Sequence, residues 1–202
     1  MKILNLYAGI GGNRKLWGDE HEITAVEYIP EIAKIYQDFF PKDKVVAEDA
    51  HQYLLEHFKE FDFIWSSPPC PSHSKINKLF TGENCTNPIT YPDMKLYEEI
   101  LLLQGYFKGK YVVENVISWY KPLIVPQERA KHYFWANFYI PPYKEGYRGH
   151  YAGNEKLQLL KGFDISKYTG IDKKKVLRNC VEPETGRYIL ERAIKQEYQT
   201  LI

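Results

Sequence analysis

The sequence predicts an α/β fold in which helices cover both faces of a mostly parallel, doubly wound sheet. The first half of the chain alternates short runs typical of strands with longer stretches of helical period, which indicates βαβ units. Residues 61–66 read as an apolar strand, as expected where a sheet is covered on both faces. A chain of 202 residues with 44% hydrophobic residues buries one core. We therefore expect a single domain spanning residues 1–202.

The expected elements follow the chain in order. The strands are expected at residues 2–7, 22–27, 45–47, 61–66, 111–113 and 133–140. The helices are expected at residues 13–18, 30–40, 50–58 and 95–105. Pro30 stands in the first turn of its helix, where the missing amide hydrogen costs no hydrogen bond. Residues 71–92 are polar and without period, and loops of that length are usually functional.

Composition excludes several classes of protein. An aromatic content of 15%, with 12 Pro and 13 Gly, excludes a disordered or collagen-like chain. The longest apolar runs fall far short of the roughly 20 residues of a membrane span, and the N-terminus leaves no room for a signal peptide. We therefore expect a cytoplasmic protein without a membrane partner. The cysteines Cys70, Cys85 and Cys180 lack CxxC spacing, so neither a disulfide framework nor a metal site is expected.

The charge is divided unevenly along the chain, although the net charge is only +1. Residues 1–100 carry 10 basic and 16 acidic residues, whereas residues 101–202 carry 17 and 10. Residues 129–178 alone carry 11 basic and 4 acidic residues. Such a block is either a solvated lysine-rich face or a surface that faces phosphates.

A glycine-rich turn follows the first strand, where residues 7–13 read Tyr-Ala-Gly-Ile-Gly-Gly-Asn. Glycines there let the backbone approach a ligand, and the helix that follows offers free N–H donors. Arg14 stands where a dinucleotide fingerprint needs its third glycine, which disfavours NAD. Glu27 ends the second strand, placed to accept both ribose hydroxyls, and Asp49 follows the third, placed to accept from an adenine amine. Together they predict an adenosine ligand without a pyrophosphate, which suggests S-adenosyl-L-methionine.

A cysteine follows the fourth strand, in the run Ser-Ser-Pro-Pro-Cys-Pro at residues 66–71. The carboxyl ends of parallel strands are where open α/β sheets carry out chemistry. A lone cysteine is usually buried filler, but two prolines place Cys70 on a stiff turn before the long loop. Cys70 is therefore the nucleophile that we expect, whereas Cys85 lies inside the loop and is expected to be incidental.

Polar residues also end the fifth strand and precede the sixth. Glu114 is expected at the same sheet edge as Cys70, where a buried glutamate can donate or accept a proton near neutral pH; the alternative is a capping or salt-bridged acid. In an extended segment, alternate residues share a face, so Gln127, Arg129 and Lys131 are expected to project together. These three residues predict a site that binds an anion or a carbonyl group. The alternative is that they are only polar and charged residues at the start of a strand.

The order of these motifs resembles that of the cytosine-C5 DNA methyltransferase family. Residues 4–12 resemble the first motif of the family, with Tyr7 where Phe is common, residues 26–41 resemble the second, and residues 48–50 match the third. Pro68-Pro69-Cys70 matches the catalytic motif, with Pro71 where many members have Gln. The resemblance implies a Rossmann-like class I S-adenosylmethionine-dependent methyltransferase fold.

The later motifs extend the resemblance to residue 190. Residues 114–116 match the ENV motif, and residues 127–131 match the QxRxR motif with Lys as the second basic residue. Residues 155–163 resemble a segment that usually reads RLQGF, and residues 178–183 resemble the closing GNxVxP motif with Arg178 replacing Gly.

The resemblance also implies roles for individual residues. The implied cofactor-binding residues are Tyr7, Ala8, Gly9, Ile10, Gly11, Gly12, Glu27, Tyr28, Asp49, Ala50, Pro69, Leu96, Asn179, Cys180 and Val181. The residues expected at nucleic acid are Ser74, Gln127, Lys144 and Arg148. The implied catalytic residues are Cys70, Glu114, Arg129 and Lys131.

The implied reaction is methylation of C5 of cytosine in DNA. Cys70 would attack C6 and Glu114 would protonate N3, while Arg129 or Lys131 contacts O2 and steadies the carboxylate. A base stacked in a duplex cannot reach Cys70, so the target is flipped out or already single-stranded.

The chain departs from the family at residues 140–154. The family usually carries a target-recognition domain of on the order of a hundred residues there, whereas this chain has only a loop with Lys144, Arg148 and several aromatic residues. We therefore expect relaxed or very short sequence specificity, or help from a separate specificity protein.

Other readings of the sequence stay open. The same fold could act on RNA or on a free pyrimidine nucleotide, or the chain could be a non-catalytic cofactor-binding subunit. A thiol hydrolase would need a base beside Cys70, and His73 is the local candidate. The sequence does not choose between roles as a restriction partner, in phage self-protection or in gene regulation.

Overall fold

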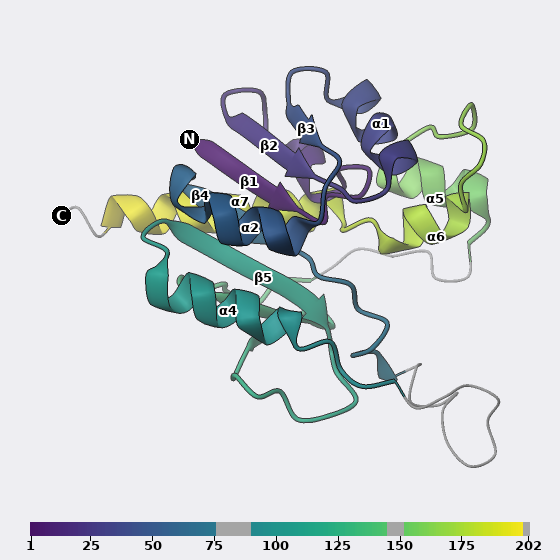
Figure 1. Ribbon diagram of the computed structural model, residues 1–202. Coiled ribbons are helices and arrows are strands. Elements are labelled where there is room, and N and C mark those ends of the chain that lie inside the picture. Colours follow the sequence, from purple (N-terminus) through teal and green to yellow (C-terminus); the bar gives the residue numbers. More distant parts are fainter. Residues whose placement is uncertain (76–89, 145–151, 200–202) are drawn as a thin grey trace, which may run out of the picture.

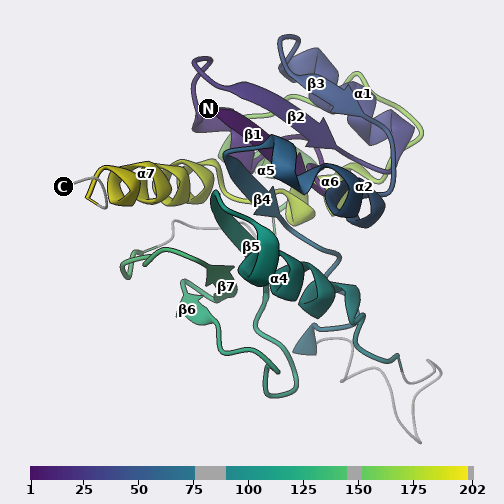
Figure 2. The ribbon, with the colours of Figure 1, turned by 60° about the vertical axis from the view of Figure 1, so that its left-hand side comes forward.

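The computed structural model describes residues 1–75, 90–144 and 152–199. Within them, the strands form a seven-stranded sheet with the order β3-β2-β1-β4-β5-β7-β6 (Figures 1 and 2). The strands are β1 (Lys2–Leu6), β2 (Glu22–Val26), β3 (Lys44–Val46), β4 (Phe63–Ser66), β5 (Lys110–Val116), β6 (Gln127–Arg129) and β7 (His132–Ala136). The pairs from β3 to β5 are parallel, and β7 is antiparallel to both β5 and β6.

Helices connect the strands and then continue beyond the sheet. The α-helices are α1 (Pro30–Phe39), α2 (Ala50–His57), α4 (Lys95–Tyr106), α5 (Asn154–Lys161), α6 (Lys173–Asn179) and α7 (Pro183–Gln199). Two short 3₁₀ helices are η1 (Asn13–Leu16) and η2 (Phe58–Glu60). Pro30 opens α1, and the Asp49 carboxylate caps α2 by accepting from the Gln52 amide at 3.0 Å.

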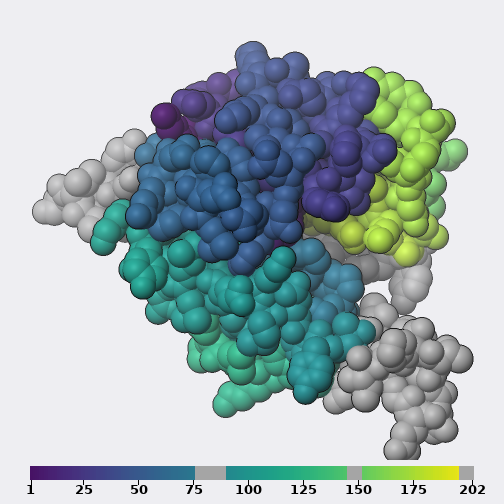
Figure 3. Space-filling model, in the orientation of Figure 1, coloured from purple at the N-terminus to yellow at the C-terminus, as the bar shows by residue number. Residues whose placement is uncertain are grey.

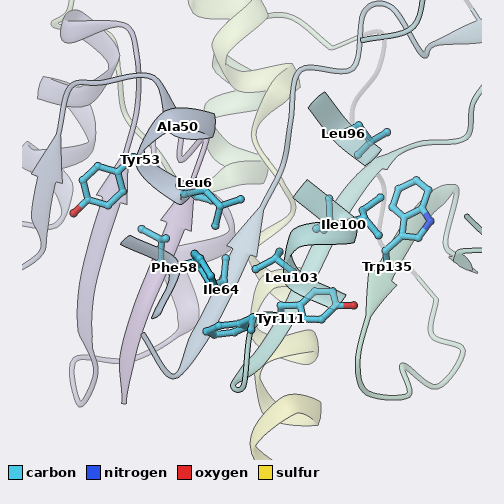
Figure 4. Packing of buried hydrophobic residues seen from close by; sticks show 14 of the residues in the cluster. Leu6, Ala50, Tyr53, Phe58, Ile64, Leu96, Ile100, Leu103, Tyr111 and Trp135 are labelled. Carbon is cyan, nitrogen blue, oxygen red and sulfur yellow. The ribbon is translucent and has the colours of Figure 1, made fainter. Parts of the chain in front are cut away.

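The two faces of the sheet are covered by different helices because successive side chains of a strand alternate between faces. On one face, Leu4 and Leu6 of β1 pack with Ile64 of β4 and with side chains of α2 and α4; Figure 4 shows this cluster. On the other face, Ile3 and Phe63 pack against α7. The sheet is therefore a buried middle layer, as an apolar central strand requires.

The segment of α5 and α6 packs against α1 (Figure 3). Ile35 of α1 shares a buried cluster with Leu157 of α5, Leu177 of α6 and Phe163. The basic second half of the chain is thus joined to the acidic first half through an apolar contact.

The sequence-based elements up to α4 agree with the structure, except that the helix expected at residues 13–18 is the short 3₁₀ helix η1. Strands β5, β6 and β7 differ from the prediction, and α5, α6 and α7 were not predicted. Strand β5 is longer than expected, and β7 stops at Ala136 instead of continuing to residue 140. The Asn137 amide explains this stop, because it accepts from the Tyr111 N–H and donates to the Gly109 carbonyl in place of a strand.

The expectation of one extended segment over residues 127–131 is wrong. Ala130 and Lys131 have φ values of 49° and 81°, and they form the two-residue turn of a β6–β7 hairpin. Lys131 therefore lies in the turn and does not share an extended face with Gln127 and Arg129.

The described helices include none that is both long enough and apolar enough to cross a membrane.

Candidate active site

The candidate active site lies where β1, β2, β4 and β5 end. These four strands are parallel, so their carboxyl ends meet at one edge of the sheet. The glycine-rich turn follows β1, Glu27 follows β2 and Cys70 follows β4, while Glu114 lies near the C-terminal end of β5. The sheet order therefore brings residues from distant parts of the sequence to one place.

The turn after β1 needs glycine at two positions. Gly9 and Gly11 have φ values of 55° and 86°, which side chains rarely adopt. A Cβ on Gly11 would lie 2.3 Å from the Phe40 ring, whereas a Cβ on Gly9 would meet nothing within 4 Å. The turn is thus packed against α1 on one side and open at Gly9 on the other.

Glu27 ties the end of β2 to this turn. Its Oε2 accepts from the Gly9 N–H at 3.0 Å, and its Oε1 accepts from the Ile29 N–H at 2.9 Å. Each carboxylate oxygen keeps a second lone pair for a ligand hydroxyl. Tyr28 beside it is exposed over 71% of its surface, so its ring is open to a ligand at the same edge.

Asp49 presents a second carboxylate beyond β3. The amide hydrogen bond from Gln52 lowers the pKa of Asp49, and Lys95, with Nζ 3.8 Å from Oδ2, lowers it further. The side chain is half exposed. Asp49 is therefore a charged acceptor that can meet a ligand.

The C-terminal segment 179–181 closes against the glycine turn. A Cβ on Gly12 would lie 2.3 Å from both the Cys180 sulfur and the Val181 carbonyl oxygen. Burial raises the pKa of Cys180 to about 12, so this cysteine is an inert packing group. The Lys161 ammonium donates to the Cys180 carbonyl at 2.8 Å and pairs with Glu182. The predicted first and last motifs are thus in contact.

Other predicted cofactor residues differ in their exposure. Ala50 and Leu96 are buried in the cluster under α2 and α4 (Figure 4), where their side chains support the site from within the core. Pro69 and Asn179 are exposed, and Ala8 and Ile10 are buried.

A buried polar network below the edge was missed by the sequence reasoning. The Glu99 carboxylate, with 0% exposure, accepts from the Tyr7 hydroxyl at 2.6 Å and from the Ser66 hydroxyl at 2.7 Å. His51 Nδ1 lies 3.1 Å from the same carboxylate. This network joins β1, β4, α2 and α4. The one sequence signal for it was an acid at position 99 on the apolar face of a predicted helix.

Arg14 also has a partner that the sequence did not indicate. Its guanidinium contacts the buried Asp43 carboxylate through Nε at 2.8 Å and through Nη2 at 3.1 Å. Tyr36 donates to the same carboxylate at 2.8 Å. Arg14 therefore fills a structural position behind the turn.

Cys70 lies on the turn that follows β4. The Asn115 amide donates to the Pro68 carbonyl at 3.0 Å and so joins this turn to the end of β5. The carbonyl of Cys70 accepts from the backbone N–H groups of His73 and Ser74. Burial raises the pKa of the Cys70 thiol, and the negative charge of Glu114 raises it further. The thiol and the carboxylate thus lie close enough to interact.

His73 is not a base for Cys70. Its Nδ1 lies 2.6 Å from the Tyr120 hydroxyl, and the ring is 1% exposed. Burial lowers the pKa of His73. The arrangement of a thiol hydrolase is therefore not formed by this residue.

Glu114 is buried and contacts a residue that the sequence reasoning did not select. His132 Nδ1 lies 3.1 Å from Glu114 Oε1. The only signal in the sequence was its place directly after the QxRxR-like run.

Gln127 and Arg129 hold a backbone segment. The Gln127 amide donates to the Phe138 carbonyl at 2.8 Å and accepts from the Ile140 N–H at 2.9 Å. Arg129 Nε donates to the Ile140 carbonyl at 2.5 Å, and its guanidinium lies 5.5 Å from the Tyr139 ring centroid. Both side chains thus anchor residues 138–140, which lead into the short loop.

The residues expected at nucleic acid lie in different places. Ser74 pairs with Ser118 in an isolated bridge beside the Cys70 turn, and Lys144 is exposed. Arg148 and Cys85 lie outside the described residues.

Residues 1–100 match the model of the C-5 cytosine-specific DNA methylases. The match covers just under half of this chain, and it names the family to which the first 100 residues are similar. Cys70, Glu27 and Asp49 lie within the match, whereas Glu114 and the later motifs lie beyond it.

Three solved structures illustrate the similarity. A DNMT2 mutant of Spodoptera frugiperda is 27% identical, with 57% of this chain covered, 35% of that chain covered and a TM-score of 0.38. A putative DNA modification methyltransferase encoded within a prophage of Escherichia coli is 17% identical, with coverages of 60% and 33% and a TM-score of 0.40. A SAM-dependent methyltransferase of Agrobacterium tumefaciens is 13% identical, with coverages of 59% and 40% and a TM-score of 0.43.

This chain thus spans 33–40% of the length of these three proteins. The comparison with curated proteins gives no match.

The predicted fold class and cofactor are confirmed. The sheet is mostly parallel with the order β3-β2-β1-β4-β5-β7-β6, and S-adenosyl-L-methionine is the methyl donor of the family that residues 1–100 match. The residues present fit this cofactor, because Gly9 faces open space and Glu27 and Asp49 supply acceptors on either side.

Proposed function

We propose that the protein transfers a methyl group from S-adenosyl-L-methionine to C5 of cytosine in DNA through a covalent bond between Cys70 and C6. The observation that carries the proposal is the junction of the Cys70 turn with the end of β5. Asn115 joins the two segments, and the Glu114 charge acts on the Cys70 thiol. A nucleophile and a proton donor therefore stand on one side of the edge, with the glycine turn on the other.

The methyl donor would be held by the glycine turn, by Glu27 and by Asp49. Glu27 would accept the ribose hydroxyls with its remaining lone pairs, and Asp49 would accept from the adenine amine. The bound cofactor supplies an electrophilic methyl group. The C-terminal segment at Cys180 and Val181 supports the turn from behind, because it fills the space beside Gly12.

The chain's own residues would activate the base. The Cys70 thiolate forms a bond to C6 while Glu114 gives a proton to N3, which makes C5 nucleophilic. After C5 has gained the methyl group, a solvent water takes the C5 proton, the C5=C6 bond forms again as the Cys70–C6 bond breaks and its electron pair returns to sulfur, and the N3 proton returns to Glu114. Because Cys70 is half-buried at the sheet edge, the cytosine must leave its stack to reach it.

The short loop supports relaxed or partner-dependent sequence specificity. Gln127 and Arg129 use their polar groups on the backbone of residues 138–140, and this leaves them fewer groups with which to read bases. Lys144 is exposed and can contact a phosphate. A long site in the major groove would need more reading side chains than this loop offers.

The experiment is incubation with methyl-labelled S-adenosylmethionine and mixed-sequence DNA, followed by bisulfite sequencing. RNA and free cytidine nucleotides are tested in parallel. The expected result is 5-methylcytosine in DNA in many contexts, lost in Cys70→Ala and kept in Cys85→Ala. Labelling of RNA alone or of the nucleotide alone would show that this molecule, and not DNA, is the substrate. No labelling of any of them would favour a non-catalytic subunit. A strict site of four or more base pairs would refute relaxed specificity.

A further inference from the structure

We propose that His132 is the positioning residue for Glu114, a place that the sequence reasoning gave to Arg129 or Lys131. This inference rests on the proposed function. Glu114 is 7% exposed, and within residues 1–75, 90–144 and 152–199 its carboxylate contacts the imidazole of His132. The side chain of His132 is 17% exposed. A buried carboxylate needs a polar partner, and here that partner is an imidazole.

The sheet order makes His132 the neighbour of Glu114. Strand β7 lies between β5 and β6, and His132 pairs with Val116 of β5 on one side and with Arg129 of β6 on the other. Glu114 and Val116 share a face because they are two residues apart, and directly paired residues share it too. His132 therefore lies on β7, between β5 with Glu114 and β6 with Arg129, and on the same face of the sheet as both residues. Arg129 is two strand spacings from Glu114, or about 10 Å of backbone separation.

Of the basic residues predicted for this role, Arg129 is bonded to backbone carbonyls and Lys131 is exposed. Arg129 donates from Nε to the Ile140 carbonyl and from Nη1 to the Glu128 carbonyl. Lys131 lies in the hairpin turn with φ of 81°. The first basic group that reaches Glu114 thus comes from β7.

The contact also gives the two carboxylate oxygens of Glu114 different roles. His132 Nδ1 lies 3.1 Å from Oε1, at ion-pair distance though not aligned as a hydrogen bond. A small rotation of the carboxyl group about its broad last torsion aligns Nδ1–H with Oε1. Oε1 is then engaged by the imidazole, and Oε2 is left for N3 of the cytosine.

The imidazole holds its proton throughout the reaction. Glu114 transfers the Oε2 proton to N3 as the Cys70–C6 bond forms, and the carboxylate that remains is stabilised by Nδ1–H on Oε1. When the Cys70–C6 bond breaks, the N3 proton returns to Oε2. No proton is gained or lost at His132, so its role is to orient the carboxyl group and to stabilise its charged form.

Two amide substitutions test which ring nitrogen matters. The side-chain nitrogen of Asn occupies the place of Nδ1, whereas that of Gln reaches the place of Nε2. Rates and KM values are measured for the wild type, His132→Asn, His132→Gln and His132→Ala on one DNA substrate, with thermal melting of each. We expect kcat to fall roughly 10²-fold in the Gln and Ala variants and less than about tenfold in the Asn variant. The KM for S-adenosylmethionine should stay within about twofold, because the glycine turn, Glu27 and Asp49 follow β1, β2 and β3, whereas His132 lies on β7.

His57→Asn is the matched control, because His57 Nδ1 also contacts a glutamate, Glu60, at 2.7 Å but lies at the end of α2. Its kcat should equal that of the wild type. Equal losses in the His132→Asn and His132→Gln variants, or no loss in either, would overturn the inference, and this comparison holds even where the Ala variant fails to fold. If the wild type methylates no cytosine substrate, the proposed function fails instead.

Discussion

At the scale of single residues, the chemistry of the site depends on how burial sets protonation. Cys70 is kept as a thiol at rest by burial and by the charge of Glu114, both of which raise its pKa. The reacting species is the thiolate. Glu114 therefore has opposite effects in its two protonation states: the charged carboxylate disfavours the Cys70 thiolate, whereas the protonated carboxyl group supplies the proton for N3.

Glu114→Gln separates these effects. Removing the charge lowers the pKa of Cys70, so alkylation of the thiol by iodoacetamide at pH 7.5 should become faster. Methyl transfer should fall by about 10²–10⁴-fold, because the amide cannot protonate N3. Alkylation is read by mass spectrometry with Cys70→Ala as the blank. Slower alkylation, or unchanged methyl transfer, would contradict this account.

His51 makes stability depend on pH. The Glu99 hydrogen bond raises the pKa of His51. A raised pKa in the folded state means that this contribution to the free energy of unfolding is complete below the pKa of an unfolded histidine, about 6.5, and is lost as the pH rises through the folded value. The difference in urea midpoint between the wild type and His51→Gln should thus be largest at pH 5.5 and smaller at pH 8.5. A difference in urea midpoint that increases with pH would contradict this prediction, because it would mean that folding lowers the pKa of His51.

At the scale of elements, the site is built by close contact between the turn after β1 and the segment before α7. Gly12 allows this contact, because Cys180 and Val181 occupy the space where a side chain would be. The segment in turn is fixed by Lys161 at the end of α5. The helices at the C-terminus thus support the cofactor turn at the N-terminus.

Gly12→Ala should push this segment away. The new Cβ would meet backbone, which cannot rotate aside, so we expect a loss of roughly 1–3 kcal/mol in unfolding free energy. The KM for S-adenosylmethionine should rise by tenfold or more. Gly105→Ala in α4 is the control: a Cβ there meets nothing within 4 Å, and alanine should be neutral or stabilising by about 0.5–1 kcal/mol. Equal effects of the two substitutions would contradict the proposed packing.

The order of strands and helices from β1 to β5 could be predicted from the sequence, because buried parallel strands and their helices have distinct periods, whereas the helices after β7 were not predicted. The residues at the ends of these strands could be predicted as well, since parallel strands bring them to one edge. Tertiary pairings could not. His132 follows Lys131 and Glu99 follows Glu98, so neither stands out in the sequence, and only the sheet order and the packing of α4 show what they contact. The role of Lys131 was misjudged because the turn at Ala130 has no glycine or asparagine to mark it.

At the scale of the whole molecule, an acidic half carries the glycine turn and a basic half carries the loop and the helices beyond it. Phosphate contacts from such a half position a nucleic acid without reading its sequence. DNA binding should therefore weaken steeply with salt and vary little with sequence. Fluorescence anisotropy with two unrelated duplexes from about 50 to 200 mM salt measures both dependences. A much tighter affinity for one duplex, with the same salt dependence for both, would contradict this prediction, because it would require base-specific contacts.

The covalent step is tested most directly with a duplex that carries 5-fluorocytosine. Fluorine at C5 cannot leave as a proton, so after methyl transfer the Cys70–C6 bond should persist. With S-adenosylmethionine present, the account predicts a protein–DNA adduct that survives denaturation and whose peptide map places the bond on Cys70. Methylation of unmodified DNA without any adduct on the fluorinated duplex, or an adduct on another residue, would contradict it.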